Sequence, residues 1–241
     1  MGVMKALEEM GISFDMISGS SSGAIAGALY ASGNSPDDIL NIIQETKFFR
    51  LIKLAISKSG LLKMESAELL YRQYILEDSF EKLRIPLIIA ATDLARGTTV
   101  YFSKGPLIRP LMASTCIPVV FDPVRVNGRL YIDGGLLNNL PAEVMAEKCD
   151  KLIGVHSNPV DDAFQAGNMK TMLERTFLLA INANAYSRRK YCDLFIEPPL
   201  LNKFKMFDLN RAEEIFRIGY EHTMSMEKTV RTFQETIVTH S

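Results

Sequence analysis

The 241-residue chain has few cysteines, no tryptophan and no excess of charge of either sign. Its three cysteines lie far apart without a Cys-x-x-Cys pair, which argues against a disulfide framework and against a cysteine zinc site. Lysine and arginine number 27 and the acids 28, and a formal net charge of -1 excludes the basic surplus of nonspecific nucleic-acid binding. We therefore expect no metal and no nucleic-acid partner. The cysteines are Cys116, Cys149 and Cys192.

The chain also lacks a long apolar run and a leader-like N-terminus. The apolar stretches 24–31 and 85–91 are shorter than the roughly 20 residues that a membrane-spanning helix needs. Residues 1–11 form an acidic amphipathic pattern, without the basic and apolar regions of a signal peptide. These absences predict a cytoplasmic protein, in which any contact with a membrane would be at the membrane surface.

Composition and patterning predict one globular α/β domain over residues 1–241. Hydrophobic residues make up 47% and charged residues 23%, which is ordinary for a folded domain. The apolar strand cores lack strict alternation, which is typical of a sheet covered on both faces. We predict a three-layer α/β/α fold around a mostly parallel central sheet, with core motifs in 1–160 and a helical C-terminal part in 169–241. Strands are predicted at 12–18, 86–92, 99–103, 129–133, 151–156 and 193–197, and helices at 1–10, 24–32, 36–48, 65–76, 141–148, 169–190 and 211–233.

A turn with the pattern Gly-x-Ser-x-Gly lies between the first predicted strand and the helix after it. Ser21 is its centre, and Gly19, Ser20, Ser22 and Gly23 complete it. The pattern is typical of a nucleophile elbow, in which glycines on both sides leave room for a sharp turn. Amides at the start of the helix would stabilise negative charge near the serine oxygen. The alternative interpretation is a Ser/Gly-rich loop that binds phosphate or only turns the chain.

The base for this serine is predicted to be an aspartate. The histidines lie at an apolar strand end, in an amphipathic helix and beside the C-terminus, which are structural or surface contexts. Asp133 instead follows the strand 129–132 and precedes Gly134 and Gly135, so its carboxylate stands at a strand end where it can accept a serine proton. The alternative is that Asp-Gly-Gly is an ordinary turn. The histidines are His156, His222 and His240.

Three segments, in order, resemble the patatin-like phospholipase family. They are GVMKALEEMGISFDMISGSSSGAIAGALYASG, IPLIIAATDLARGTTVYF and MASTCIPVVFDPVRVNGRLYIDGGLLNNLPAEVM. The resemblance covers most of residues 1–160 and is nearest to the short bacterial single-domain form. It implies that Ser21 is the nucleophile and Asp133 the proton acceptor of a Ser-Asp dyad, which hydrolyses acyl esters, typically of lipids, without a metal or a cofactor.

The family's usual first strand and its glycine-rich G-G-G-x-R-G loop have no counterpart before residues 2–10. That loop supplies amides to the oxyanion hole, and losing one such donor costs roughly 100- to 1000-fold in rate. We expect either a native start upstream of Met1 or a shortened, catalytically weak protein. The alternative function is accordingly lipid binding or regulation on the same fold. No oligomeric state is predicted.

Two segments mix basic residues with large apolar ones. Segment 47–58 has four basic residues and no acid, and segment 200–207 has two lysines among apolar side chains. Such segments can lie in an anionic lipid interface, and we predict peripheral membrane contact through 47–58. The alternative is that they pack over the mouth of the active site with their lysines solvated. Cys116, near the expected acyl pocket, is predicted to be a small buried residue.

Overall fold

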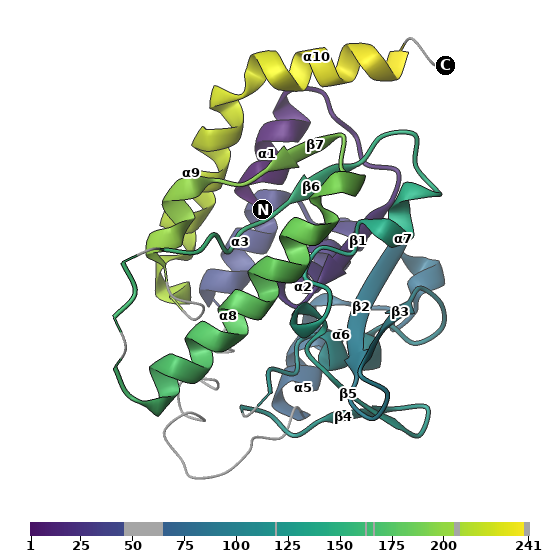
Figure 1. Cartoon of the computed structure of the whole chain (residues 1–241). Helices are drawn as coiled ribbons and strands as arrows, with labels where there is room; N and C mark the ends of the chain where they lie inside the picture. Colours follow the sequence, from purple (N-terminus) through teal and green to yellow (C-terminus); the bar gives the residue numbers. More distant parts are fainter. Residues whose placement is uncertain (46–64, 119, 162, 166, 205–207, 239–241) are drawn as a thin grey trace. The chain divides into compact units, whose positions relative to one another are not determined.

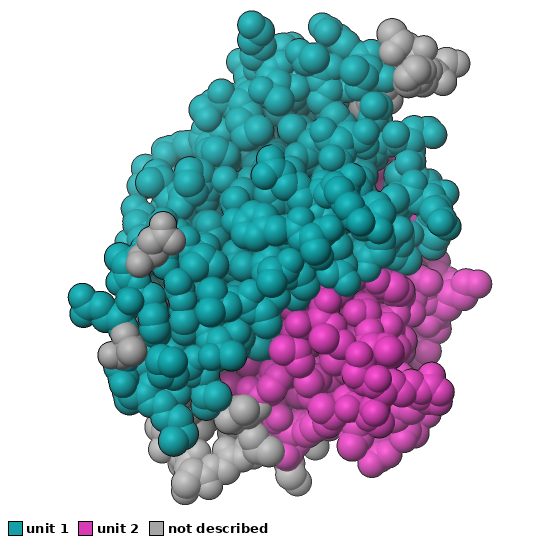
Figure 2. Space-filling view, viewed as in Figure 1, with its two compact units in different colours: residues 1–14, 36–44, 142–241 teal, residues 15–35, 45–141 magenta. Residues whose placement is uncertain are grey.

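The computed structural model describes residues 1–241 except 46–64, 119, 162, 166, 205–207 and 239–241. The chain divides into two compact units, each built from segments distant in sequence (Figure 2). Unit 1 comprises Met1–Phe14, Pro36–Gln44 and Ala142–Ser241, and unit 2 comprises Asp15–Ser35 and Glu45–Pro141. The prediction of a single domain over 1–241 stays a prediction.

Unit 2 is a central sheet with helices packed on it (Figure 1). The middle strand β2 pairs parallel with β1 and antiparallel with β3 and β5, while β4 pairs antiparallel with β5. Helix α2 packs on β1 and β2, and α6 packs on β2, β4 and β5. The elements are β1 (Ile17–Ser20), α2 (Ser22–Ala31), α5 (Glu65–Tyr74), β2 (Leu87–Asp93), β3 (Thr98–Phe102), α6 (Ile108–Ser114), β4 (Val124–Val126), β5 (Arg129–Ile132) and the 3-10 turns Phe80–Lys82 and Gly134–Leu136.

The sequence of unit 2 explains why α2 lies close to the sheet. All seven residues of β2 are buried, as its continuous apolar pattern predicts. A Cβ on Gly27 of α2 would lie 3.0 Å from side-chain carbons of both Ile17 and Leu87. Glycine at this position therefore allows the helix to approach both strands, which fixes the place of the α2 N-terminus.

Unit 1 contains most of the helices that the structure describes and a two-stranded parallel sheet, β6 with β7. Helix α1 packs closely against α9. Glycine at position 2 permits this approach, because a Cβ there would collide with the carbonyl oxygen of Phe216. Its core includes Val3, Leu7, Ile12, Leu194, Ile196, Val230 and Phe233. The elements are α1 (Gly2–Glu9), α3 (Pro36–Glu45, whose last residue falls in unit 2), α7 (Glu143–Ala146), β6 (Ile153–Val155), α8 (Met169–Arg188), β7 (Leu194–Ile196), α9 (Ala212–Ser225) and α10 (Glu227–Val238), with 3-10 turns at Arg189–Tyr191, Pro199–Lys203 and Leu209–Arg211.

The predicted α/β class, with a central sheet and helices, is confirmed. The sheet of unit 2 is mixed instead of mostly parallel, because β3 and the β4–β5 pair enter it as antiparallel hairpins. The second of these hairpins turns at Asn127 and Gly128, both with positive φ, and its first strand, β4, was not predicted.

Three further helix and strand assignments differ from the predictions. The first strand begins at Ile17 and not at residue 12, because the Ile12 amide bonds back to the Leu7 carbonyl and its side chain packs in the core of unit 1. Helix α6 was missed altogether. The predicted helix 211–233 is two helices, which meet at Met226.

Candidate active site

The register of unit 2 brings the predicted nucleophile and the predicted base together. Strand β1 pairs with β2 as far as Ser20, which lies opposite Ala90. Strand β5 runs in the opposite direction, and its last residue, Ile132, lies opposite Thr92. Both strands lie along the same edge of β2, because β3 occupies the other edge. The two strands therefore point at each other, and the residues that follow them meet.

Ser21 and Asp133 form a direct hydrogen bond. Ser21 Oγ donates to Asp133 Oδ2 at 2.6 Å. Asp133 is 1% exposed, and its other carboxylate oxygen accepts the Gly135 N–H at 2.8 Å. Thr92 Oγ1 donates to the Asp133 carbonyl oxygen at 2.9 Å. The backbone and the carboxylate of Asp133 are thus both held, with one oxygen directed at the serine hydroxyl.

Burial raises the pKa of Asp133 from 3.8 to about 6, although hydrogen bonds from Ser21 and from the Gly135 amide act in the opposite direction. The cause is desolvation, which disfavours the charged carboxylate. Above about pH 6 the group is ionised and able to accept a proton. A carboxyl with its pKa moved toward neutrality in this way has the properties of a general base.

The backbone of Ser21 has the strained geometry of a sharp strand-to-helix turn. Its φ is 51° and its ψ is −122°, directly after β1 and directly before α2. A Cβ on Gly19 would lie 2.5 Å from the Gly23 carbonyl oxygen, so glycine is required there. A Cβ on Gly23 would meet nothing within 4 Å, which means that the expected steric need for glycine on both sides is wrong for the second position.

The two glycines after Asp133 allow a second close approach. A Cβ on Gly134 would overlap the carbonyl oxygen of Ala90 in β2 and lie 2.6 Å from Ser20 Oγ. A Cβ on Gly135 would lie 3.0 Å from Asp133 Oδ1. The Asp-Gly-Gly turn is therefore required for packing on β2 as well as for turning the chain.

The N-terminus of α2 offers amide donors beside the serine. The first amides of an α-helix have no acceptor within the helix, and here they belong to Ser22 and Gly23. The amide of Ser21 itself is already used, because it donates to Ser114 Oγ at 3.0 Å. The Ser22 amide is thus the natural donor to an oxyanion formed at Ser21.

Ser114 is a site residue that was not predicted from the sequence. It is fully buried at the C-terminal end of α6. The signal for this helix was present in the helical spacing of Leu107, Ile108, Leu111 and Met112, all of them buried.

The histidines lie in unit 1 or outside the described residues. His156 is buried after β6, and its Nδ1 lies 2.7 Å from Glu197 Oε1, which also accepts the Tyr186 hydroxyl. His222 is half-buried on α9, and His240 falls outside the described residues. The structural role expected of His156 stays a prediction.

Cys116 has the buried position that was predicted. Its thiol is fully buried and contacts the Asp122 carbonyl oxygen, and burial raises its pKa to about 12. The predicted lipid-contact segment 47–58 lies outside the described residues, as does part of 200–207.

Comparison with known proteins decides the family. The patatin-like phospholipase family profile matches residues 1–146, more than half of the chain. The chain belongs to the patatin-like phospholipase family. Ser21 and Asp133 both fall within this matched part of the family's sequence.

The relatives of this family member are longer proteins. An uncharacterised NTE family protein of Mycobacterium tuberculosis is 36% identical over 160 residues, which are 65% of this chain and 44% of that protein. A patatin-like phospholipase domain-containing protein of Caenorhabditis elegans is 25% identical over 92% of this chain and 19% of its own. Lysophospholipase NTE1 of Candida glabrata is 24% identical over 91% of this chain and 14% of its own. The chain thus spans less than half the length of these relatives.

A solved structure shares the fold. VipD from Legionella pneumophila superposes with a TM-score of 0.52 at 13% identity, over 95% of this chain and 64% of that one. In the described ranges, no group of three or more histidine, cysteine or acidic side chains is placed to hold a metal ion. None of the helices in those ranges is long and apolar enough to cross a membrane.

Proposed function

We propose that this chain hydrolyses acyl esters of lipids through a Ser21–Asp133 dyad. The observation that carries the proposal is the 2.6 Å hydrogen bond from Ser21 Oγ to a buried Asp133 carboxylate. Family membership supports a lipid ester as the substrate class, because the family is that of the patatin-like phospholipases.

The chemistry follows from the positions of the two side chains. Asp133 takes the Ser21 proton as Oγ attacks the ester carbonyl carbon, and the Ser22 amide donates to the resulting oxyanion. Collapse of the tetrahedral intermediate breaks the ester C–O bond, and Asp133 passes the proton to the departing alcohol. Asp133 then deprotonates a water molecule, which attacks the acyl-serine and releases the fatty acid. The proton returns to Ser21 Oγ, so that the dyad is restored.

The test is hydrolysis of p-nitrophenyl esters and of a fluorescent phospholipid. We expect Ser21→Ala and Asp133→Asn each to lower kcat by about 1000-fold or more. Matched controls are Ser32→Ala, at the other end of α2, and Asp15→Asn, an exposed carboxylate before β1. Both controls should hydrolyse the esters at the wild-type rate.

A second readout is labelling by a fluorophosphonate, followed by peptide mass spectrometry. The label should appear on the peptide that contains Ser21, and Asp133→Asn should slow its appearance. Wild-type protein that binds lipid vesicles but neither hydrolyses the esters nor takes up the label would overturn the proposal in favour of lipid binding or regulation.

A further inference from the structure

A three-residue segment at the C-terminal end of α6 reaches both members of the dyad. Ser114 Oγ accepts the Ser21 N–H at 3.0 Å, and it donates to the Ala90 carbonyl oxygen at 2.7 Å. Two residues later, the Cys116 carbonyl oxygen accepts the Asp133 N–H at 2.8 Å. One short stretch of chain therefore bonds to the backbone of the proposed nucleophile and to that of the proposed base.

The direction of the Ser114 hydroxyl is fixed by its two partners. A serine hydroxyl has one hydrogen, and a carbonyl oxygen can only accept, so the hydrogen points to Ala90. A lone pair is then left for the Ser21 amide. Ser114 is fully buried, so solvent does not compete for either bond. The Ser114 hydroxyl thus links the middle strand β2 to the backbone nitrogen of Ser21.

The nucleophile needs such a link because its backbone is strained. Among the described residues other than glycine, Ser21 and Asn127 have positive φ, and Asn127 lies in a hairpin turn. A conformation of this kind costs on the order of 1–3 kcal/mol and persists when the surroundings hold it. A buried hydrogen bond at the Ser21 amide offsets part of that cost and fixes where Oγ points.

The residue between these two contacts is also anchored. Thr115 Oγ1 lies 3.0 Å from the hydroxyl of Tyr71 on α5, and it donates to the Leu111 carbonyl oxygen at 2.9 Å. Both Thr115 and Tyr71 are buried. The segment 114–116 therefore has contacts to β2, to α5 and to the residue after β5, which leaves little freedom for it to move.

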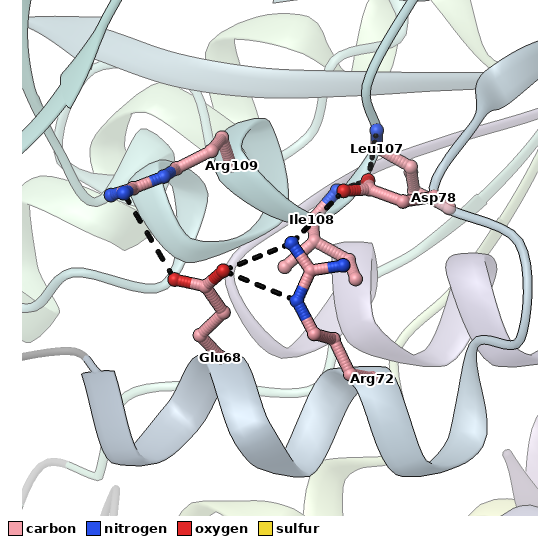
Figure 3. Close-up of polar contacts among 6 residues, drawn as sticks. All are labelled: Glu68, Arg72, Asp78, Leu107, Ile108 and Arg109. Carbon is pink, nitrogen blue, oxygen red and sulfur yellow. Dashed lines mark hydrogen bonds and ion pairs between the residues drawn. The ribbon is translucent and has the colours of Figure 1, made fainter.

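The N-terminal end of α6 is held by a carboxylate in a charged cluster (Figure 3). Asp78 Oδ1 accepts the amides of Leu107 and Ile108, each at 2.8 Å. Arg72 on α5 lies between Asp78 Oδ2, at 3.3 Å, and Glu68 Oε1, at 3.0 Å. A seven-residue helix has little stability of its own, so this anchor and the buried contacts of α6 determine where its C-terminal end lies.

We propose that Ser114 is a positioning residue, which holds the Ser21 amide so that Ser21 Oγ stays within hydrogen-bonding distance of Asp133. This inference rests on the proposed function for its effect on turnover, but its structural part does not. Ser114 contacts no substrate in this scheme, since it acts through the backbone of the nucleophile.

The structural part is tested by NMR on the Ser21 amide. In Ser114→Ala, we expect this proton to move upfield and to exchange with solvent about tenfold faster, as the loss of a single buried hydrogen bond would allow. Ser114→Cys keeps a weaker donor and acceptor on a somewhat larger side chain. Its Ser21 amide shift and exchange rate should lie between those of wild type and of Ser114→Ala. Thr223→Val removes a buried hydroxyl that bonds within α9, to the Gly219 carbonyl oxygen, and should leave the Ser21 amide shift unchanged.

The functional part is tested by steady-state hydrolysis with the same proteins. Ser114→Ala should lower kcat by about 10- to 100-fold and leave KM within about twofold of wild type. The reason is that the variant keeps its contacts with the substrate but no longer holds Ser21 Oγ in position beside Asp133. Ser114→Cys should recover part of kcat. A Ser21 amide that is unaffected by Ser114→Ala, or an altered amide with unchanged kcat, would overturn the inference. If Ser114→Ala alters the amide but the wild-type protein hydrolyses no ester, the proposed function is rejected and the Ser114 contact is retained.

Discussion

Replacing Asp133 by asparagine should stabilise the folded protein while removing its proposed activity. The carboxylate is buried, and its pKa in the folded protein is about 6, compared with 3.8 for an exposed aspartate. Asparagine has almost the same shape but carries no charge to desolvate. Its carbonyl oxygen can accept the Gly135 amide, and its NH2 group can donate to Ser21 Oγ.

The size of the effect follows from the two pKa values. The rise from 3.8 to about 6 corresponds to about 3 kcal/mol of free energy, with 1.36 kcal/mol for each unit. Because the folded-state pKa is the higher one, the folded protein holds a proton over this interval and the unfolded chain does not. Stability therefore falls as the pH rises from about 4 to about 6, and the full penalty is present above that. An asparagine at this position does not titrate, so the variant should lose this part of the pH dependence.

The measurement is urea unfolding of wild type and Asp133→Asn at about pH 8 and about pH 4. We expect the variant to be more stable by about 2–3 kcal/mol at the higher pH and nearly equal to wild type at the lower one. Asp15→Asn is the control, because it removes the carboxylate of an exposed side chain in place of a buried one. A stability difference for Asp133→Asn that is the same at both pH values would refute the argument from desolvation.

Two further predictions follow from the same site. The kcat/KM for ester hydrolysis should fall about tenfold per pH unit below about pH 6, because protonated Asp133 cannot act as a base. Initial rates measured over a series of pH values check this. A kcat/KM that stays level down to about pH 4 would contradict it. Gly134→Ala should destabilise the fold by about 1–3 kcal/mol because its Cβ would overlap the Ala90 carbonyl oxygen. A Cβ on Gly23 would lie in open space, so Gly23→Ala should be at least as stable as wild type. Equal melting temperatures for the two glycine variants would refute the prediction that a close backbone contact requires glycine at position 134 and not at position 23.

Much of the local structure was predictable from the sequence. Strand β2 and the antiparallel strand after it were identified from their apolar and β-branched residues, and α1 from its spacing and from the glycine after it, Gly11, whose φ is 85°. The family was also indicated by three motifs in order, and the family profile confirms it. These features are local, since each depends on residues that are close in sequence.

Other features were missed because distant contacts decide them. Ile12 has a strand-like sequence context, yet it packs in the core of unit 1, and the pairing with β2 begins only at Ile17. Strand β4 has three residues, and the hairpin that contains it depends on the Asn127-Gly128 turn. Helix α6 is short, contains Pro110 and is held by the Asp78 carboxylate, so its apolar spacing was a weak signal by itself.

The sequence by itself determined the chemical identity of the candidate site. A Gly-x-Ser-x-Gly turn before a helix and an aspartate at a strand end specify which side chains are present and which local backbone each one has. The tertiary structure alone decided that these two strand ends meet along one edge of β2, that the carboxylate is buried there, and that Ser114 bonds to the amide of Ser21. The physical reason is that register and burial are properties of contacts between segments far apart in the chain, as the separations of 112 and 93 residues for the Ser21–Asp133 and Ser21–Ser114 hydrogen bonds show.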